Sequence, residues 1–472
     1  MNQDLKNYEQ KGGHTIKFAI MSIVGIFLFM VPLPFVTDDG YTAFNIPLGF
    51  AINWVGLTLN SLEINGFGFI FLLAAVVITI SLIGSLLAWF VKPAFIENNE
   101  KMKDLFKCNI IYLVSKVVGA ALAWMVFFGI GPSFIIGWEG GRLMMDLIAG
   151  GGSGSNLMSI FIVLGIAIPL LTDFGLMEFL GTLISKVVRV LFTLPGRSSI
   201  DLLGSWFSSS AASVIITRDQ HEKGFYTGRE AAAICVNFTL VSLPFTFVVA
   251  SQMGLQGHFG WFYLVVTITT LLLAAVFPRI WPLSRIKDEY LPEVGKQIEE
   301  EVPEKTSMLS FATKLASRRA SQTGPVDVVK SGGKNWLNIF MDLIPVIMAW
   351  GTVAIILVES TEIFTWISMP FRFYLELFQI QGAADYAHTT IVGFIDMFLP
   401  AILLGTAAPL ETRFILGALS IVQIIYLAET GILILKSKIP LNIGHLAILF
   451  LMRTIVALPI IVLLARVLPV SL

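Results

Sequence analysis

The sequence is poor in residues that carry charge or bind metal. Charged residues make up 13% of the 472, the net charge is −1, and there are only 2 cysteines and 5 histidines. A nearly neutral chain gives no reason to expect a nucleic acid or an anionic partner. Cys108 and Cys235 lie in apolar runs, where a small buried residue is expected rather than a disulfide or a pair of metal ligands.

The sequence also lacks the short motifs that mark common catalytic sites. It contains no G-x-x-x-x-G-K-[ST], no H-E-x-x-H, no paired C-x-x-C and no G-x-S-x-G. The glycine-rich run at 150–155 has no lysine to hold a phosphate, so it is expected to be a hinge. The sequence therefore predicts a protein that is not an enzyme and has neither a cofactor nor a metal site.

Long apolar runs dominate the rest of the chain, in which 56% of residues are hydrophobic. A helix needs about 20 mostly apolar residues to cross a bilayer. Full spans are expected at 16–36, 66–91, 108–131, 156–181, 228–250, 260–283, 336–358, 410–434 and 443–467. Shorter or interrupted pieces, which are candidates for re-entrant hairpins or half-helices, lie at 47–60, 183–194, 198–216, 362–379 and 386–408. The predicted fold class is an all-α polytopic membrane protein.

The charges of the loops predict the orientation of the chain. Lysines gather in the N-terminal arm and in 92–107, whereas the only charged residues of the 37–46 loop are Asp38 and Asp39. Because cytoplasmic loops are enriched in Lys and Arg, the N-terminus is predicted to be cytoplasmic. The segment 284–335 then falls inside as a solvated linker, with an amphipathic turn around Ser310–Ala320. Whether this linker is regulatory is left open.

The two membrane halves on either side of the linker show the same order of features. Each has a broken amphipathic piece, an Asp in a polar hairpin, an acidic/Arg pair at a helix start and then a span, and the charge rule gives the two halves opposite senses. This predicts an inverted repeat with broken-helix hairpins. The expected division is 1–104 for N-terminal membrane helices, 105–283 for the first repeat, 284–335 for the linker and 336–472 for the second repeat.

Asp201 and Asp396 are the leading candidates for a substrate or ion site. Each lies in a hairpin otherwise made of Ser, Gly, Pro and apolar residues, where an ionised carboxylate at membrane depth needs a cation, hydrogen-bond donors or a proton. The structural alternatives are a helix cap or a pair with Arg197 for Asp201, and a local hydrogen bond for Asp396.

Further polar residues are expected near the same site. Ser205 and Ser209 either line a polar path or let two helices approach closely. The remaining candidates lie on the helices that follow the two hairpins, namely Asn237, Gln423, Tyr426 and Glu429. A Glu429 inside the bilayer needs a partner, for which Arg453, Asp173 and Glu178 are available.

Five charged residues are assigned gating or structural roles. Glu230 at a helix start is favoured by the helix dipole without any function, and Arg229 is expected to mark the cytoplasmic interface. The full set is Arg197, Arg229, Glu230, Glu411 and Arg413.

The runs FTLPGRSSIDLLGSWFSSSAASVIITRDQHEKGFYTGREAAAICVNFTLVSLPF and GFIDMFLPAILLGTAAPLETRFILGALSIVQIIYLAETGILILKSKIPLN resemble the nucleoside-recognition, or Gate, domain proteins. The resemblance is to their YjiH-like branch and covers about residues 105–470. It implies a bacterial inner-membrane protein with Gate-type hairpins around Asp201 and Asp396. The implied fold is related to concentrative nucleoside transporters, the membrane part of the ferrous-iron transporter B and the spore maturation proteins A and B. Lacking a phosphate loop, the chain departs from the iron transporter.

The predicted function is secondary transport of a small polar solute by alternating access around a mid-membrane site. The solute class is a nucleoside, an amino acid or a short peptide, and the candidate coupling ion is Na⁺ or H⁺. The alternative is a non-transporting Gate-domain scaffold or partner-dependent subunit. The expected partners are the lipid bilayer, the solute, and a second copy or a second Gate-domain subunit.

Overall fold

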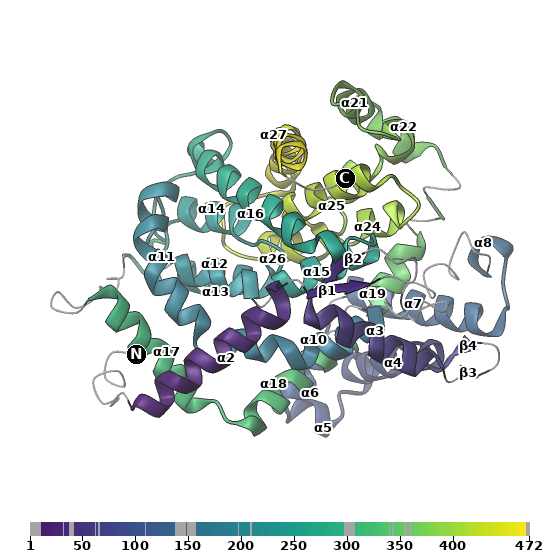
Figure 1. Cartoon of the computed structure of the whole chain (residues 1–472), viewed down its shortest axis with the longest axis horizontal. Helices are drawn as coiled ribbons and strands as arrows, with labels where there is room; N and C mark the ends of the chain where they lie inside the picture. The colour runs from purple at the N-terminus through teal and green to yellow at the C-terminus, as the bar shows by residue number, and fades with distance from the viewer. Residues whose placement is uncertain are drawn as a thin grey trace. The chain divides into compact units, whose positions relative to one another are not determined.

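The structure, a computed structural model of the chain, is helical and contains several membrane-spanning candidates (Figure 1). It describes residues 11–31, 33–36, 42–61, 63–64, 67–108, 110–136, 148, 157–196, 198–207, 210–296, 307–338, 340–341, 344–353, 356–357 and 361–468. Among these, 4 helices are long and apolar enough to cross a membrane, or up to 5 if one bent pair is a single span. They are Gly12–Phe29, Phe69–Val91, Gln256–Arg285 and Ile443–Val467, with the pair Met158–Thr172 and Leu176–Phe192. The predicted fold class, a multi-pass helical membrane protein, is confirmed.

The chain forms two compact units. Unit 1 contains residues 1–45, 168–328 and 370–472, and unit 2 contains 46–167 and 329–369. Three helices pass from one unit into the other: α10 (Leu157–Thr172), α18 (Pro325–Asn338) and α21 (Ile363–Leu377). Unit 1 thus contains segments of both predicted repeats, and the division into repeats proposed from the sequence stays a prediction.

Unit 2 is built around two apolar helices that pack on each other, α4 (Phe69–Leu86) and α7 (Ile110–Phe128). Across them, Trp124 Nε1 donates to Thr79 Oγ1 at 2.7 Å and Lys116 Nζ donates to Ser85 Oγ at 3.1 Å. The other elements are α3 (Pro47–Asn60), β3 (Glu63–Ile64), β4 (Phe67–Gly68), η1 (Leu87–Val91), α5 (Ala94–Glu97), α6 (Glu100–Phe106), α8 (Ser133–Ile136), α19 (Ile344–Val346) and η6 (Ile347–Gly351).

Unit 1 holds both predicted hairpins and the helices that follow them. Its first part comprises α2 (Gly12–Met30), the antiparallel strands β1 (Leu33–Val36) and β2 (Thr42–Asn45), α11 (Leu176–Phe192), α12 (Ser198–Phe207), α13 (Ser210–Glu222), α14 (Gly228–Asn237), α15 (Leu243–Gln252), η2 (Gln256–His258) and α16 (Phe259–Val276). Its second part comprises η3 (Phe277–Arg279), η4 (Leu283–Arg285), α17 (Met308–Gln322), α22 (Ala383–Tyr386), α23 (Thr389–Val392), α24 (Leu399–Leu404), α25 (Leu410–Val422), η7 (Leu427–Gly431), α26 (Ile432–Leu435) and α27 (Ile443–Val467).

Two of the predicted full spans, those that follow the hairpins, are broken. The expected span 228–250 consists of α14 and α15, separated at 238–242, and the expected span 410–434 consists of α25 and η7–α26, separated at 423–426. We call these the first and second breaks. Pro244 and the N-cap Ser242 start a new helix after the first break, and the left-handed backbone of Ile424, with φ of 63°, turns the chain at the second.

The shorter apolar pieces have mixed outcomes. The interrupted segment 198–216 is the helical hairpin α12–α13, and 386–408 contains the short helices α23 and α24, as expected. In contrast, 183–194 belongs to the continuous helix α11, and 362–379 is the single helix α21 with Pro370 inside it. The prediction of 156–181 as one full span is wrong as well, because α10 ends at Thr172 and α11 begins at Leu176, and the two helices are bent by 56°.

The two hairpins and the two broken helices contact each other reciprocally within unit 1. The second arm of the first hairpin, α13, packs on η7 and α26, which form the second half of the second broken helix. The second arm of the second hairpin, α24, packs on α15, the second half of the first broken helix. The long helices that follow, α16 and α27, pack on each other (Figure 1). This is the pairing expected of an internal repeat, whereas the opposite membrane sense of its halves stays a prediction.

The segment 284–335 is more ordered than its composition suggested. The expected amphipathic turn is the helix α17, which packs on α2 and α11 (Figure 1) and buries Ala312, Ala316, Ser317 and Ala320. Small side chains let the helix axes approach closely, so the packing needs few large apolar residues. The expected helical turn is therefore present, whereas the prediction that the segment is solvated does not hold for α17.

Candidate functional site

The two breaks meet at one buried arginine. Arg453 of α27 is 0% exposed, and its Nη1 donates to Val236 O at 3.0 Å and to Asn237 Oδ1 at 2.8 Å, both at the end of α14. Its Nε and Nη2 donate to Val422 O, the last residue of α25, at 3.2 and 2.9 Å. The last carbonyls of a helix lack intrahelical partners, so one guanidinium satisfies the free ends of both broken helices.

Asn237 is positioned to serve this arginine. Its Nδ2 donates to Ala233 O at 2.9 Å within α14, which directs the amide oxygen towards Arg453. The sequence predicted a binding role for Asn237. The structure brings it to the first break and gives it the guanidinium as its partner.

Gln423 and Tyr426 lie in the second break, and both are buried. Gln423 Nε2 donates to Thr390 O and to Thr454 Oγ1, both at 2.8 Å, which ties the break to the second hairpin and to α27. Tyr426 OH lies 2.9 Å from the carbonyl oxygens of Ser420 and Ile421. The tyrosine hydroxyl therefore lies against the last carbonyls of α25, while the side-chain amide oxygen of Gln423, Oε1, is buried without a hydrogen bond.

Each hairpin is also bonded to the break that follows it in the chain. Ser205 Oγ of α12 lies within hydrogen-bond distance of two carbonyl oxygens, Phe238 O in the first break and Leu202 O of its own helix, and its single proton can be donated to either. In the second half, Leu427 N donates to Phe394 O of the second hairpin at 2.8 Å. Ser205 thus acts as a link between hairpin and break, in agreement with the packing alternative for the serines.

Asp201 is buried, with 2% of its surface exposed, and is held by donors from neighbouring segments. Its Oδ2 accepts from Tyr226 OH at 2.7 Å and from Thr217 Oγ1 at 3.5 Å, and its backbone carbonyl accepts from Ser213 Oγ at 3.1 Å. A buried carboxylate needs such donors. This is a donor cluster of the kind that the sequence argument required, and it fixes α12 to α13 and to the turn before α14.

Asp396 is half-buried in the loop before α24, and its Oδ1 accepts from Phe398 N at 2.8 Å. Such a bond from a side chain to the backbone two residues ahead is a common turn-forming contact of Asp. The structure therefore contains the local hydrogen bond that the structural alternative expected. The contact uses one carboxylate oxygen, and a role of Asp396 in binding stays a prediction.

The charged residues at the starts of the broken helices make structural contacts. Glu230 forms a capping box with Thr227, in which Thr227 N donates to Glu230 Oε2 at 2.8 Å. Arg229 Nη2 donates to Pro278 O at 3.2 Å, and Arg413 Nη1 donates to Met253 O, at the end of α15, at 2.6 Å. Glu411 Oε1 accepts from Arg466 Nε at 2.9 Å.

Three predicted residues have side chains outside the part of the chain that the structure describes. They are Arg197, Ser209 and Glu429, of which Glu429 lies in the π-helical turn η7. Of the partners proposed for Glu429, Arg453 bonds to the helix ends described above, and the two acidic residues lie in a different cluster.

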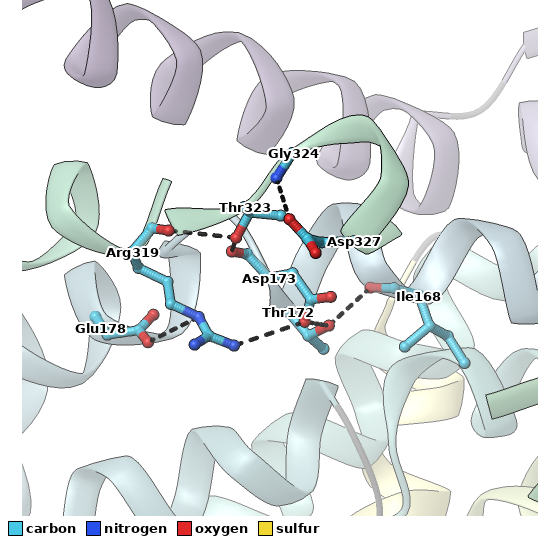
Figure 2. Close-up of polar contacts among 8 residues, drawn as sticks. All are labelled: Ile168, Thr172, Asp173, Glu178, Arg319, Thr323, Gly324 and Asp327. Carbon is cyan, nitrogen blue, oxygen red and sulfur yellow. Dashed lines mark hydrogen bonds and ion pairs between the residues drawn. The ribbon is translucent and has the colours of Figure 1, made fainter. Parts of the chain in front are cut away.

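That cluster is centred on Arg319 of α17. Figure 2 shows its guanidinium between two carboxylates: Nη2 lies 3.9 Å from Asp173 Oδ1, and Nε lies 3.9 Å from Glu178 Oε1. Thr323 Oγ1 also donates to Asp173 O at 2.7 Å. These contacts fasten α17 over the bend between α10 and α11, and Asp173 and Glu178 belong to this attachment.

Sequence reasoning missed the position of Arg453 at the centre of the arrangement. It treated the residue only as a partner for Glu429. The available signal was an arginine in the middle of the 25-residue helix α27, since a charge at such a depth marks a partner or a function. Among the described residues, no group of three or more His, Cys, Asp or Glu side chains could hold a metal ion.

Comparison with known proteins finds a family and a relative for this chain. The family described as Gate, nucleoside recognition, matches residues 155–256, from the start of α10 to the end of the first broken helix. An uncharacterized protein of Alkalihalophilus pseudofirmus is 44% identical over 457 residues, covering 96% of this chain and 94% of that protein. The chain belongs to the nucleoside-recognition (Gate) family.

Two solved structures are similar to this Gate protein over most of its length. A doubly substituted form of CNTnw in an outward-facing state has 12% identity and a TM-score of 0.42, with 96% of each chain covered. CNTnw in an inward-facing substrate-bound state has 13% identity and a TM-score of 0.41, with 97% of this chain and 99% of that chain covered.

Proposed function

We propose that this Gate protein is a secondary transporter of a small polar solute, working by alternating access around the two breaks. The proposed solute is a nucleoside, an amino acid or a short peptide, and the proposed driving ion is Na⁺ or H⁺. The protein is proposed to lie in the bacterial inner membrane with a cytoplasmic N-terminus, as a homo-oligomer or with a second Gate-domain subunit.

The observation that carries this proposal is the reciprocal packing of two hairpins on two broken helices. Broken helices place half-helix ends and free backbone groups inside the membrane, where they can bind a solute. Because there are two such hairpin–helix pairs, the site at the two breaks can open towards one face of the membrane or towards the other. A protein that needed only to span the bilayer would have no use for such breaks, because every backbone group freed at this depth costs roughly several kcal/mol unless another group satisfies it, as Arg453 does here.

Nucleosides come first among the candidate solutes because the matching family is described as nucleoside recognition. The test is a thermal-shift screen of the purified full-length protein against nucleosides, amino acids and dipeptides, with and without Na⁺. A solute that binds only the folded protein raises its unfolding temperature. Uptake of that solute by proteoliposomes is then the expected result, and binding without uptake would contradict transport.

A second candidate, a non-transporting membrane scaffold, is favoured by the state of the two hairpin aspartates. Asp201 is enclosed by Tyr226 and Thr217, and Asp396 bonds to its own turn. Both contacts suit hairpins that stay sealed. The scaffold predicts that no solute shifts the unfolding temperature and that the protein co-purifies with a partner subunit.

A further inference from the structure

The oxygens around Arg453 form the kind of set that holds a free cation. Val236 O and Asn237 Oδ1 accept from Nη1, whereas Val422 O accepts from Nε and Nη2, so oxygens at the ends of two different helices surround one guanidinium. Carbonyl oxygens at the unwound ends of half-helices coordinate Na⁺ in transporters built from broken helices. In this protein, three guanidinium nitrogens bond to that set instead.

Among the described hydrogen bonds of Arg453, none is to a carboxylate. The C-terminal end of a helix carries about −0.5 of an elementary charge, so the ends of α14 and α25 together carry about −1. A single guanidinium supplies +1, as a single monovalent cation would. The aromatic ring of Phe277 lies 5.4 Å from the guanidinium carbon, which further stabilises a positive charge there.

Arg453 also joins segments that belong to different predicted repeats. Val236 lies in the first repeat, whereas Val422 and Arg453 lie in the second. The planar guanidinium has donors on several edges and reaches both helix ends at once, which a point charge such as a lysine ammonium does less well. The residue therefore fixes the distance between the breaks.

We propose that Arg453 is a tethered cation that takes the position of a free monovalent cation at the two breaks. Because the arginine occupies the carbonyl oxygens permanently, the folded protein does not need Na⁺ at this point. The consequence for transport, which rests on the proposed function, is that no Na⁺ binds at these two helix ends during uptake.

The first test measures the unfolding temperature of the purified full-length protein in detergent, in NaCl and in choline chloride at equal ionic strength. The wild type is expected to unfold at the same temperature in both salts. A specific rise in Na⁺ would overturn the proposal, because it would show that a free cation site remains.

The second test is chemical rescue of Arg453→Ala with methylguanidinium at millimolar concentration. The variant is expected to unfold at a lower temperature than the wild type, and methylguanidinium to restore part of the loss by filling the vacated space. The matched control is Arg466→Ala, which removes a partly exposed arginine from the same helix. An equal response of wild type, control and variant, or no response of the variant, contradicts the proposal.

A second pair of variants serves if Arg453→Ala does not fold. Arg453→Lys keeps the charge but bridges the two helix ends less well, so it is expected to retain part of the stability, whereas Arg453→Gln keeps a hydrogen-bond donor without the charge and is expected to lose more. Equal unfolding temperatures for the two would show that charge is not the reason for the arginine. These measurements need no solute, so the absence of any uptake would refute the proposed function while leaving their outcome intact.

Discussion

At the scale of single residues, the two hairpin aspartates differ in their burial and in the number of hydrogen bonds that their carboxylates accept. Asp201 is fully buried and accepts hydrogen bonds from two side chains that belong to neighbouring segments. Asp396 is half-buried and its described contact uses one of its two carboxylate oxygens. An asparagine would keep that contact but remove the charge. A substitution at Asp396 can therefore test the role of the charge without disturbing the turn.

We expect Asp396→Asn to abolish uptake while the protein still inserts and unfolds at its normal temperature. The asparagine Oδ1 still accepts from Phe398 N, so the turn before α24 is kept. Asp396→Ala loses the acceptor as well and is expected to cost about 0.5–1.5 kcal/mol of stability, the usual net contribution of one hydrogen bond. Uptake is measured in proteoliposomes, with Asp385→Asn on the exposed start of α22 as the control. Unchanged uptake by Asp396→Asn would remove this residue from the mechanism.

At the scale of elements, α17 shows how a segment of low hydrophobicity becomes fixed. Its alanine face lies against the turn at Gly175, where φ is 96° and an added Cβ would lie 2.5 Å from Ala316 O. Phe18 of α2 packs on Ala316 and Ala320 in the same cluster, and Arg319 bonds to both sides of the bend. The helix is thus attached by close approach and charge rather than by a large apolar area.

We expect Gly175→Ala to detach α17 from the bend. The added methyl group clashes with the Ala316 backbone, and the left-handed backbone adds about 1–2 kcal/mol of strain. The measurement is maleimide labelling of Ser317→Cys, a position that is 0% exposed, in a background where Cys108 and Cys235 are replaced by serine. Maleimide is expected to react with the cysteine of Ser317→Cys faster when Gly175→Ala is also present than when Gly175 is unchanged.

The control for this prediction is Gly295→Ala. Gly295 also has positive φ, of 71°, but an added Cβ meets nothing within 4 Å. It therefore carries the backbone strain without the clash. If both variants label at the same rate, strain alone explains the effect and the close approach of Gly175 to α17 is not needed.

At the scale of the whole molecule, the loop charges and the predicted repeat together predict which loops face the cytoplasm and which face outward. The turn after α13 and the turn after α26 should both face the cytoplasm, and the loop between α15 and α16 should face outward. Such a pattern places corresponding segments of the two halves in opposite senses, which is the condition for exchange between two open states.

We expect cysteines at Lys223 and Lys436 to be protected from an impermeant maleimide in intact cells, and a cysteine at Gln256 to be labelled. The two lysines are exposed, so their replacement disturbs little packing. The experiment uses the same background without native cysteines, and permeabilised cells show that all three sites can react. Labelling of Lys436→Cys from outside would refute the inverted arrangement.

The sequence was informative wherever polarity interrupted an apolar run. Both hairpins were located from residues such as Asp201 and Asp396, because a charge at membrane depth is costly and therefore conspicuous. The breaks at Asn237–Ser242 and Gln423–Tyr426 were not located. Each lies in a continuous stretch of mostly apolar residues, and a count of hydrophobic length does not detect a local change of backbone direction.

By itself, the sequence determined that this is a multi-pass helical membrane protein of the Gate family, with two polar hairpins. Hydrophobic length and the cost of buried charge are local properties of the chain. Only the tertiary structure decided that the spans after the hairpins are broken, that α17 is docked, and that Arg453 joins the ends of both broken helices. The physical reason is that a broken helix is stable only when distant groups satisfy its free carbonyls, and here that donor lies 31 residues from one end and 217 from the other.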